Sequence, residues 1–278
     1  MTTARDTRGF KWVAGLPMYD FPHLRAAHDA LWTAVAERLA ACGVTGVPRY
    51  LTRDRGHLDL LRDPFLLFGQ TCEYPLAASY TDVVTLVGTP CYTASGCDGA
   101  LYCSVVIVRA DDTVEELTGL RNRRCVVNEW DSNSGMNLLR AVIAAVSDGA
   151  PFFKSVVRSG SHLSSVEQVA RGDADVAAVD CVSFAHLQQV CPADIAKLRV
   201  LCRTPASPSL PFITARAGSD FTIRALRSVL ADVLSDASLA AVRQQLLLGG
   251  IDFEPDTDFT AVRHLERQAV GSRYPTLC

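Results

Sequence analysis

The stretch Arg124–Asn137, with the sequence RCVVNEWDSNSGMN, decides the fold class. Its first four residues predict a short buried strand, and Gly135–Val146 has the apolar spacing of a helix. Between them lies a polar turn, rich in the Ser, Asn and Asp residues that favour helix starts. A strand that passes through such a turn into a helix is the unit from which α/β proteins are built.

The same alternation extends over most of the chain, so we predict an α/β fold with mainly parallel sheets. Helices are predicted at Arg25–Cys42, Ser164–Ala170 and Phe221–Leu248. Further strands are predicted at Trp12–Leu16, Phe65–Phe68, Val83–Val87, Ser104–Val108, Val156–Val157, Val176–Val179, Leu198–Leu201 and Phe212–Ala215.

The length of 278 residues suits two lobes of about 100–150 residues each. Two segments predict crossings between lobes: Tyr102–Ser104, which precedes a new strand, and Thr204–Pro211, whose three prolines indicate a stiff connection. We therefore place residues 1–102 and 205–278 in lobe 1 and residues 103–204 in lobe 2.

Composition excludes several classes of partner. The net charge is -3 and no basic block occurs, so neither nucleic acid nor a membrane surface is expected to bind. No apolar run approaches the ~18 residues of a membrane-spanning helix. No signal peptide is recognisable, which predicts a cytoplasmic protein if the sequence is complete. We expect a monomer.

The ten cysteines show neither a C-x-x-C pair nor the spacing of a zinc site. We expect most of them to be reduced, buried thiols that pack as small hydrophobic side chains. No metal ion and no cofactor are predicted.

Three polar segments follow predicted strands and supply candidate ligands for an anion. Ser132, Asn133 and Ser134 precede a helix, Ser161 and His162 precede the next one, and Asp180 ends a strand. Backbone N–H groups at a helix start attract anions. The alternative is that these side chains cap helices, as Ser, Asn and Asp commonly do, and that His162 is a surface residue.

Polar or aromatic residues also follow three strands of the predicted first lobe. Tyr19 follows Trp12–Leu16, Gln70 and Thr71 follow Phe65–Phe68, and Tyr92 follows Val83–Val87. Because ligands of α/β sheets bind at the carboxyl ends of strands, these residues are candidate walls of a pocket. An isolated tyrosine is also an ordinary packing residue.

Four segments together resemble a known family. They are QTCEYPL from Gln70, DSNSGMN from Asp131, SGSH from Ser159 and GDADVAAVDC from Gly172. Their order and spacing are similar to those of the phosphate, phosphite and phosphonate substrate-binding proteins of ABC importers. That family has the type 2 periplasmic-binding-protein fold, whose two lobes close on a ligand like a Venus flytrap.

The resemblance implies a small phosphorus oxyanion in an interlobe cleft and an ABC permease as partner. Ser132, Ser134, His162 and Asp180 would hold the anion from lobe 2, with Asn133 and Ser161 in the same segments. Tyr19, Gln70, Thr71 and Tyr92 would contact it from lobe 1. The chain departs from the family at Asn133, where a threonine is common, and at Glu73, which adds a carboxyl group beside the site. The family is exported.

Two other functions stay open. No nucleophile elbow, Walker A loop, H-E-x-x-H or G-x-G-x-x-G motif occurs, so no catalytic residue is predicted. An enzyme on the same fold, as in thiamine-precursor chemistry, would use His162 with Cys72 or Cys181. A cytosolic ligand sensor would use the same pocket as a transport receptor.

Overall fold

The computed structural model describes residues 12–216, 218–254 and 260–278. They form two compact units. The first contains residues up to 71, 79–90 and 210–254, and the second contains residues 72–78, 91–209 and the C-terminal segment. Each unit is built on its own five-stranded sheet.

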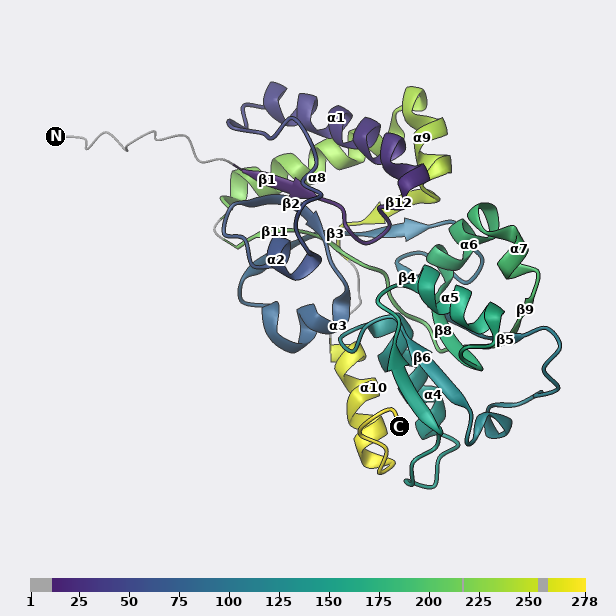
Figure 1. Ribbon diagram of the computed structural model, residues 1–278. Helices are drawn as coiled ribbons and strands as arrows, with labels where there is room; N and C mark the ends of the chain where they lie inside the picture. Colours follow the sequence, from purple (N-terminus) through teal and green to yellow (C-terminus); the bar gives the residue numbers. More distant parts are fainter. Residues whose placement is uncertain (1–11, 217, 255–259) are drawn as a thin grey trace. The chain divides into compact units, whose positions relative to one another are not determined.

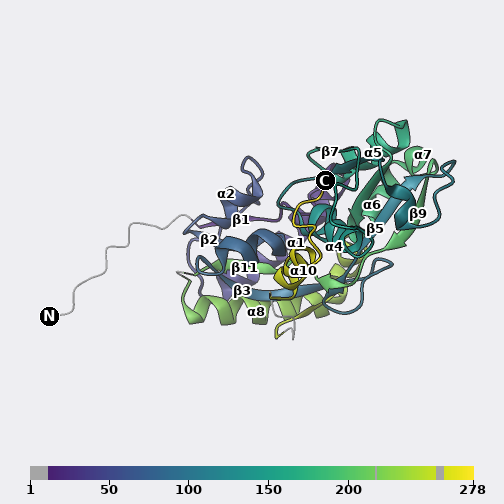
Figure 2. The same cartoon turned by 90° about the horizontal axis from the view of Figure 1, so that it is seen from below.

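The sheet of the first unit has the strand order β1-β2-β11-β3-β12. Strand β1 is parallel to β2, whereas β11 is antiparallel to both β2 and β3. Helices α1, α8 and α9 pack together at one side of this sheet (Figure 1), and Figure 2 shows α8 running along it. The elements are β1 (Val13–Gly15), η1 (Pro22–Leu24), α1 (Arg25–Ala41), α2 (His57–Leu61), β2 (Leu66–Gln70), β3 (Val84–Tyr92), β11 (Phe212–Ala215), α8 (Asp220–Ser235), η5 (Ala237–Leu239), α9 (Ala240–Gln245) and β12 (Leu248–Asp252).

The sheet of the second unit has the order β7-β6-β8-β5-β9. Strand β6 is parallel to β7 and β8, and β5 is antiparallel to β8 and β9. The strands are β4 (Leu101–Tyr102), β5 (Ser104–Arg109), β6 (Arg124–Val127), β7 (Ser155–Arg158), β8 (Val176–Asp180), β9 (Leu198–Arg203) and β10 (Ser207–Pro208), the last paired with β4. The helices are α3 (Glu73–Pro75), η2 (Leu76–Tyr80), η3 (Leu117–Leu120), η4 (Asn133–Asn137), α4 (Leu138–Ala144), α5 (His162–Arg171), α6 (Cys181–Val190), α7 (Pro192–Ile195) and α10 (Thr260–Gly271).

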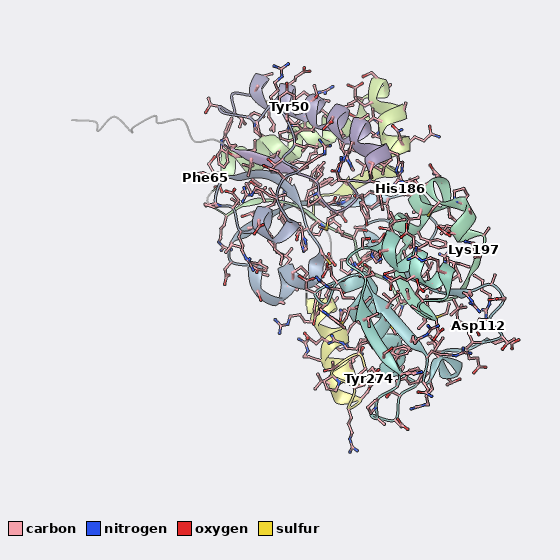
Figure 3. The ribbon with its side chains drawn as sticks, in the orientation of Figure 1. Tyr50, Phe65, Asp112, His186, Lys197 and Tyr274 are labelled. Atoms are coloured by element: carbon pink, nitrogen blue, oxygen red, sulfur yellow. The ribbon has the colours of Figure 1, made fainter. Side chains whose placement is uncertain are left out.

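Alternating side chains give the second sheet two buried faces. Val106, Val108, Val176 and Ala178 face a core that includes Leu139 and Ile143 of α4 and Tyr274 near the C-terminus (Figure 3). The intervening residues of the same strands point to the other face, since side chains alternate along a strand. Helix α5 contacts β5, β6 and β8 and contributes its own buried residues outside that core.

The C-terminal segment completes this core. Helix α10 packs on α4, and the carbonyl oxygen of Cys278 accepts hydrogen bonds from the backbone N–H groups of Phe152 (2.7 Å) and Phe153 (2.9 Å). The sequence-based lobe assignment placed the whole of residues 205–278 in lobe 1. The structure differs, because the apolar face of α10 and Tyr274 are buried against α4 of the second unit.

The α/β fold class is confirmed, but the sheets are mixed and not mainly parallel. The antiparallel strands, β11 in the first unit and β5 in the second, each pair with two neighbours in the sheet.

The boundary between the two units at residues 209/210 lies within the predicted crossing Thr204–Pro211. The boundary at 90/91 lies earlier than the predicted crossing at Tyr102–Ser104. The other lobe boundaries remain a prediction.

The predicted helix Phe221–Leu248 is wrong as one element. Helix α8 begins at its cap Ser219, whose Oγ accepts the N–H of Thr222 at 3.2 Å, and it ends at Ser235. Asp236 then takes an extended conformation, and its Oδ1 accepts the N–H of Ser238 at 2.8 Å. An Asp side chain that caps a new turn competes with helix continuation, so the chain restarts as η5 and α9. None of the helices in the described part of the chain is long and apolar enough to cross a membrane.

Truncation of a core residue tests the packing of the second unit. Leu139 is fully buried between α4 and the sheet, so Leu139→Ala should lower the free energy of unfolding by about 2–5 kcal/mol, measured by urea denaturation. The control is Val190→Ala, because Val190 is 47% exposed and its truncation should cost less than about 0.5 kcal/mol. Equal effects of the two changes would contradict the core described above.

Candidate functional site

The candidate site is built on the first turn after β6, in the second unit. The chain enters η4 as a π-helical turn, in which the N–H of Asn137 donates to the carbonyl oxygen of Ser132 at 3.0 Å. Ser132 caps this turn, since its Oγ accepts the N–H of Gly135 at 3.0 Å. π-helical turns are rare and are frequently found at functional sites. Ser132 therefore caps a helical turn, as the capping alternative predicts. Its side chain is also buried.

Ser134 joins this turn to the segment that follows β7. Its Oγ lies 2.9 Å from Nε2 of His162 and 3.3 Å from Oγ of Ser132. Ser132 and Ser134 are each only 6% exposed. Strands β6 and β7 are parallel neighbours, so the turns at their carboxyl ends lie at the same edge of the sheet. The structure thus brings together Ser132, Ser134 and His162 in one chain of contacts.

His162 is held in its neutral form. Burial lowers the pKa of its imidazole to about 4, because the charged ring loses its hydration. Its Nε2 contacts Ser134, whereas its Nδ1 is buried and has no hydrogen-bond partner among the described residues. A neutral imidazole has one donor and one acceptor nitrogen. His162 is therefore able to orient the hydroxyl group of Ser134 without adding a charge.

Asp180 lies at the same edge of the sheet, at the end of β8. It is 2% exposed, and its Oδ1 accepts the N–H of Ser183 at 2.8 Å, which caps α6. Its partner across the sheet is Ser104 of β5, and the Oγ of Ser104 donates to the carbonyl oxygen of Ser134 at 3.0 Å. Ser104 thus connects the strand pair that carries Asp180 to the Ser134 turn. The sequence analysis did not single out Ser104, because a serine at the start of a strand carries no distinctive pattern.

Asn133 has a structural role. Its side chain is fully buried, and its Nδ2 donates to the hydroxyl group of Tyr102 at 3.0 Å and to Oγ of Ser207 at 2.8 Å. Its Oδ1 accepts from Nδ2 of Asn137 at 2.9 Å. Both amide hydrogens are used within the fold. Its side-chain amide therefore keeps no free N–H group for an anion.

The partly exposed Cys72 and the buried Glu73 follow β2 and lie beside the same turn. Cys72 accepts the N–H of Asn133 at its Sγ, at 3.4 Å, and burial raises the pKa of its thiol to about 12. Glu73 is 1% exposed, and its Oε2 has no hydrogen-bond partner among the described residues. Burial raises the pKa of this carboxyl group well above its ordinary value. Burial therefore favours the protonated, neutral form of Glu73 over the negative charge that its sequence suggests.

Ser161 occupies the position of a helix cap. It is exposed, and its Oγ accepts the N–H of Ser164 at 3.0 Å at the start of α5. Among the residues that the structure describes, no hydrogen bond joins its side chain to Ser134. Among the strand-end residues predicted for the other lobe, Tyr19, Gln70 and Thr71 are buried in the first unit, and Tyr92 is buried in the second. Nε2 of Gln70 donates to the carbonyl oxygen of Leu210 at 3.0 Å, which ties β2 to the segment before β11.

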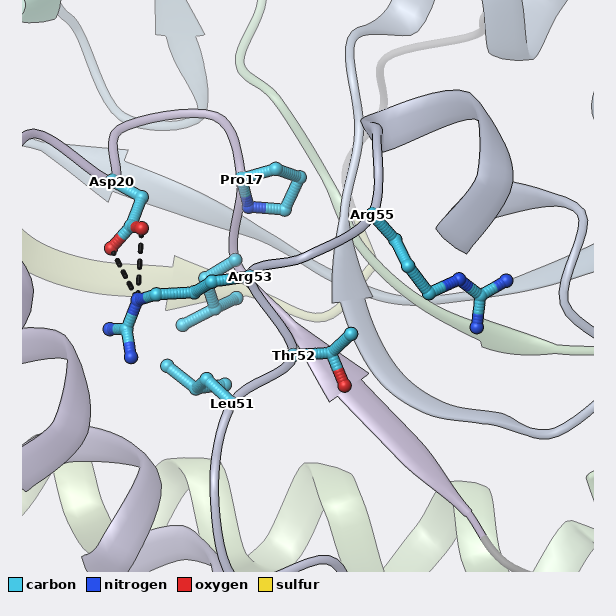
Figure 4. A pocket seen from close by; sticks show the side chains of 7 residues that line it. Pro17, Asp20, Leu51, Thr52, Arg53 and Arg55 are labelled. Carbon is cyan, nitrogen blue, oxygen red and sulfur yellow. Dashed lines mark hydrogen bonds and ion pairs between the residues drawn. The ribbon is translucent and has the colours of Figure 1, made fainter.

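A separate pocket of about 210 Å³ lies in the first unit beside the turn after β1 (Figure 4). Its two arginines are already paired. Arg53 binds both oxygens of Asp20 through its Nε at 3.1 and 2.9 Å, and Arg55 forms an ion pair with Asp63. Burial alone would raise the pKa of Asp20, but the nearby His28 and the hydrogen bonds from Arg53 lower it. The paired charges make this pocket a poor site for an anion.

Among the described residues, no group of three or more His, Cys, Asp and Glu side chains is arranged to hold a metal ion. The polar side chains described above at this edge of the second sheet are hydroxyl groups, one neutral imidazole and one capping carboxylate. Such neutral donors at a helix start are suited to binding an anion.

Comparison with known proteins identifies the family. The family model for the periplasmic substrate-binding protein of phosphonate ABC transporters matches residues 15–258. The chain belongs to this family. The family consists of periplasmic substrate-binding proteins and not of enzymes, which confirms the resemblance identified from the sequence. No curated protein sequence matches the chain.

Solved structures of phosphonate-transporter binding proteins have the same fold. A binding protein component of an ABC phosphonate transporter from Pseudomonas aeruginosa, PA3383, is 17% identical with a TM-score of 0.73, over 94% of this chain and 89% of that one. PhnD1 from Prochlorococcus marinus, in complex with methylphosphonate, is 15% identical with a TM-score of 0.73, over 93% and 98%. XAC2383 from Xanthomonas citri, bound to ATP, is 17% identical with a TM-score of 0.68, over 94% and 96%. At these identities, the similarity shows the periplasmic-binding-protein fold alone.

The raised pKa of Glu73 predicts a pH effect on stability. A folded-state pKa above the unfolded value means that the folded state binds more protons, so the free energy of unfolding falls as pH rises through that window. This contribution is at most about 1.4 kcal/mol per pH unit. Glu73→Gln should flatten the decline between pH 5 and pH 8 in urea denaturation.

The control for this experiment is Glu115→Gln, because Glu115 is an exposed glutamate of the same unit. It should leave the pH dependence of unfolding unchanged. If the wild type and Glu73→Gln lost stability equally between the two pH values, Glu73 would not be a buried neutral acid.

Proposed function

We propose that this member of the phosphonate-transporter family reversibly binds a small phosphorus oxyanion at the Ser132, Ser134 and His162 site, as a receptor for ABC-type import. The observation that carries the proposal is the 2.9 Å contact between Ser134 and His162. It unites two turns 28 residues apart into one buried polar group at the edge of a sheet, where α/β proteins bind ligands.

The chemistry of the group favours binding and release. Hydroxyl groups at the start of a helix supply donors and a partial positive charge, without a full countercharge. None of the residues in this chain of contacts is a lysine or an arginine. An anion held by neutral donors is released more readily than one held by a buried ion pair, as a transport receptor requires.

Asp180 supports selection for anions that keep a proton. A carboxylate repels a fully ionised anion but accepts a hydrogen bond from a P–OH group. Phosphate, phosphite and phosphonates carry such a proton near neutral pH, and sulfate does not. Since Asp180 is buried and coupled to the Ser134 turn through Ser104, it is the group proposed to discriminate between these anions.

Further ligand contacts and partners remain proposals that rest on the family. Tyr19, Gln70, Thr71 and Tyr92 are proposed to contact the ligand, and Ser161 to support the turn that carries His162. The methylphosphonate in PhnD1 of Prochlorococcus marinus supports the ligand class. An ABC permease is the proposed partner of a monomeric receptor.

The enzyme alternative has less support. His162 contacts Ser134 through Nε2, while the thiol of Cys72 accepts a backbone N–H. Burial raises the pKa of Cys72 to about 12. The pKa of the Cys181 thiol is also raised to about 12. The hydrogen bond with Cys103 lowers this pKa, but the contact with Cys97 and burial raise it by more. Protonated thiols are poor nucleophiles, so neither proposed cysteine–histidine pair is activated.

Removal of one hydroxyl group tests the site. Ser134→Ala should weaken the binding of methylphosphonate by about 1.5–3 kcal/mol, or roughly 10- to 150-fold in Kd, because a hydrogen bond to a charged ligand is lost. The measurement is calorimetric titration at pH 7. The control is Ser155→Ala, since Ser155 is an exposed serine of β7. Unchanged affinity in Ser134→Ala would remove the basis of the proposal.

A panel of anions tests the role of Asp180. Wild-type protein should bind phosphate, phosphite and methylphosphonate at least tenfold more tightly than sulfate. Asp180→Asn should narrow this difference, because an amide does not repel sulfate, while an asparagine still caps α6. Equal affinity of the wild type for sulfate and the phosphorus anions would show that Asp180 does not select for a proton-bearing ligand.

A further inference from the structure

Three cysteines of the second unit lie together beside Asp180. Sγ of Cys97, in the connection between β3 and β4, lies 3.5 Å from Sγ of Cys181, the first residue of α6. Cys103 adjoins Cys181, since the backbone N–H of Cys181 donates to the carbonyl oxygen of Cys103 at 3.0 Å. None of the ten cysteines, all of which the structure describes, forms a disulfide. The expectation that most of them are buried is wrong, since only Cys103, Cys125 and Cys181 are buried. Within this cluster, the sulfur atoms of Cys97 and Cys181 are in contact.

The fold holds Cys97 against Cys181 through its neighbours. Gly96 has a φ of +111°, and a Cβ atom at this residue would lie 2.8 Å from Sγ of Cys103 and 3.3 Å from Cβ of Cys181. Only glycine fits this close approach without displacement of the thiols. Arg203 fixes the same connection, because its Nη2 donates to Oγ of Ser95 at 2.8 Å. Both contacts restrain the chain directly before Cys97.

The three thiols differ in their access to solvent. Cys103 is 5% exposed and Cys181 is 2% exposed, whereas Cys97 is partly exposed. A dissolved oxidant therefore reaches Cys97 first, and Cys181 is the buried thiol in contact with it. A metal ion is a poorer explanation of the cluster, since no metal-binding group is formed by the described residues.

We propose that Cys97 and Cys181 are a thiol–disulfide site of this protein. The thiolate of Cys97 attacks one sulfur atom of a small disulfide, such as glutathione disulfide, and the S–S bond breaks to give a mixed disulfide and one thiol. Cys181, whose thiol is largely protonated, then gives up its proton, slowly displaces the second thiol and forms the Cys97–Cys181 bond. The two protons of the protein thiols leave on the two glutathione molecules, so one disulfide is consumed for each one formed.

The family's compartment supports this chemistry, because disulfides form and persist in the periplasm. The bond would tie the β3–β4 connection to the residue that follows Asp180. It closes a loop of more than 80 residues, and a disulfide across so long a loop stabilises the folded state when its geometry is preset.

The test is oxidation with glutathione disulfide at pH 8 for several hours, followed by peptide mapping under non-reducing conditions. It uses the full chain with Cys42→Ser and Cys278→Ser, which removes the two exposed thiols. We expect a peptide linked through Cys97 and Cys181, and a melting temperature about 5 °C above that of the reduced protein. Cys103→Ser is the matched control and should keep both results, whereas Cys97→Ser should lose both.

Three outcomes would overturn the proposal. One is a bond between Cys103 and Cys181, which would show that Cys97 is not the partner. Another is a stable glutathione adduct on Cys97 that Cys181 does not resolve. The third is a Cys97–Cys181 bond that lowers the melting temperature, since the fold would then not hold the two thiols in a suitable position.

Discussion

The contact between Ser134 and His162 is the interaction on which the candidate site depends. Each residue belongs to a turn at the carboxyl end of a strand, and β6 and β7 are parallel neighbours. The sheet therefore fixes the distance between the two turns, while Ser132 and the π-helical turn fix the direction of the Ser134 hydroxyl group. Neither turn alone would make a ligand site, because each is an ordinary helix start.

Burial determines the charge of this region. Burial lowers the pKa of the His162 imidazole and raises the pKa of the Glu73 carboxyl group, because their charged forms would lose hydration. Asn133 uses both of its amide hydrogens to connect β4, β10 and the π-helical turn, which makes the support beneath the site rigid. A neutral, rigid group of donors is the environment that the family's function, binding and release of a phosphorus anion, requires.

Sequence patterns predicted the parts of this structure that depend on local chemistry. The strand Arg124–Val127 has its predicted bounds, and the serine and histidine turns follow their strands as expected. Sequence patterns did not predict the features that depend on contacts between residues far apart in the chain. Ser104 connects Asp180 to Ser134 only because β5 pairs with β8. Helix α10 packs on α4, and nothing in the sequence of α10 indicates which helix it contacts. The break at Asp236 was missed because the apolar spacing of Phe221–Leu248 continues past a residue that caps a new turn.

The central claim is that a neutral His162 and Ser134 together bind the anion. Long-range proton–nitrogen NMR of the histidine rings tests it most directly, with the His162 signals assigned by their absence in His162→Asn. Between pH 5.5 and 8, His162 should stay neutral and show no titration, and its Nε2 shift should change when methylphosphonate is added. A His162 signal that titrates near pH 6.5 and does not respond to saturating methylphosphonate would contradict the account.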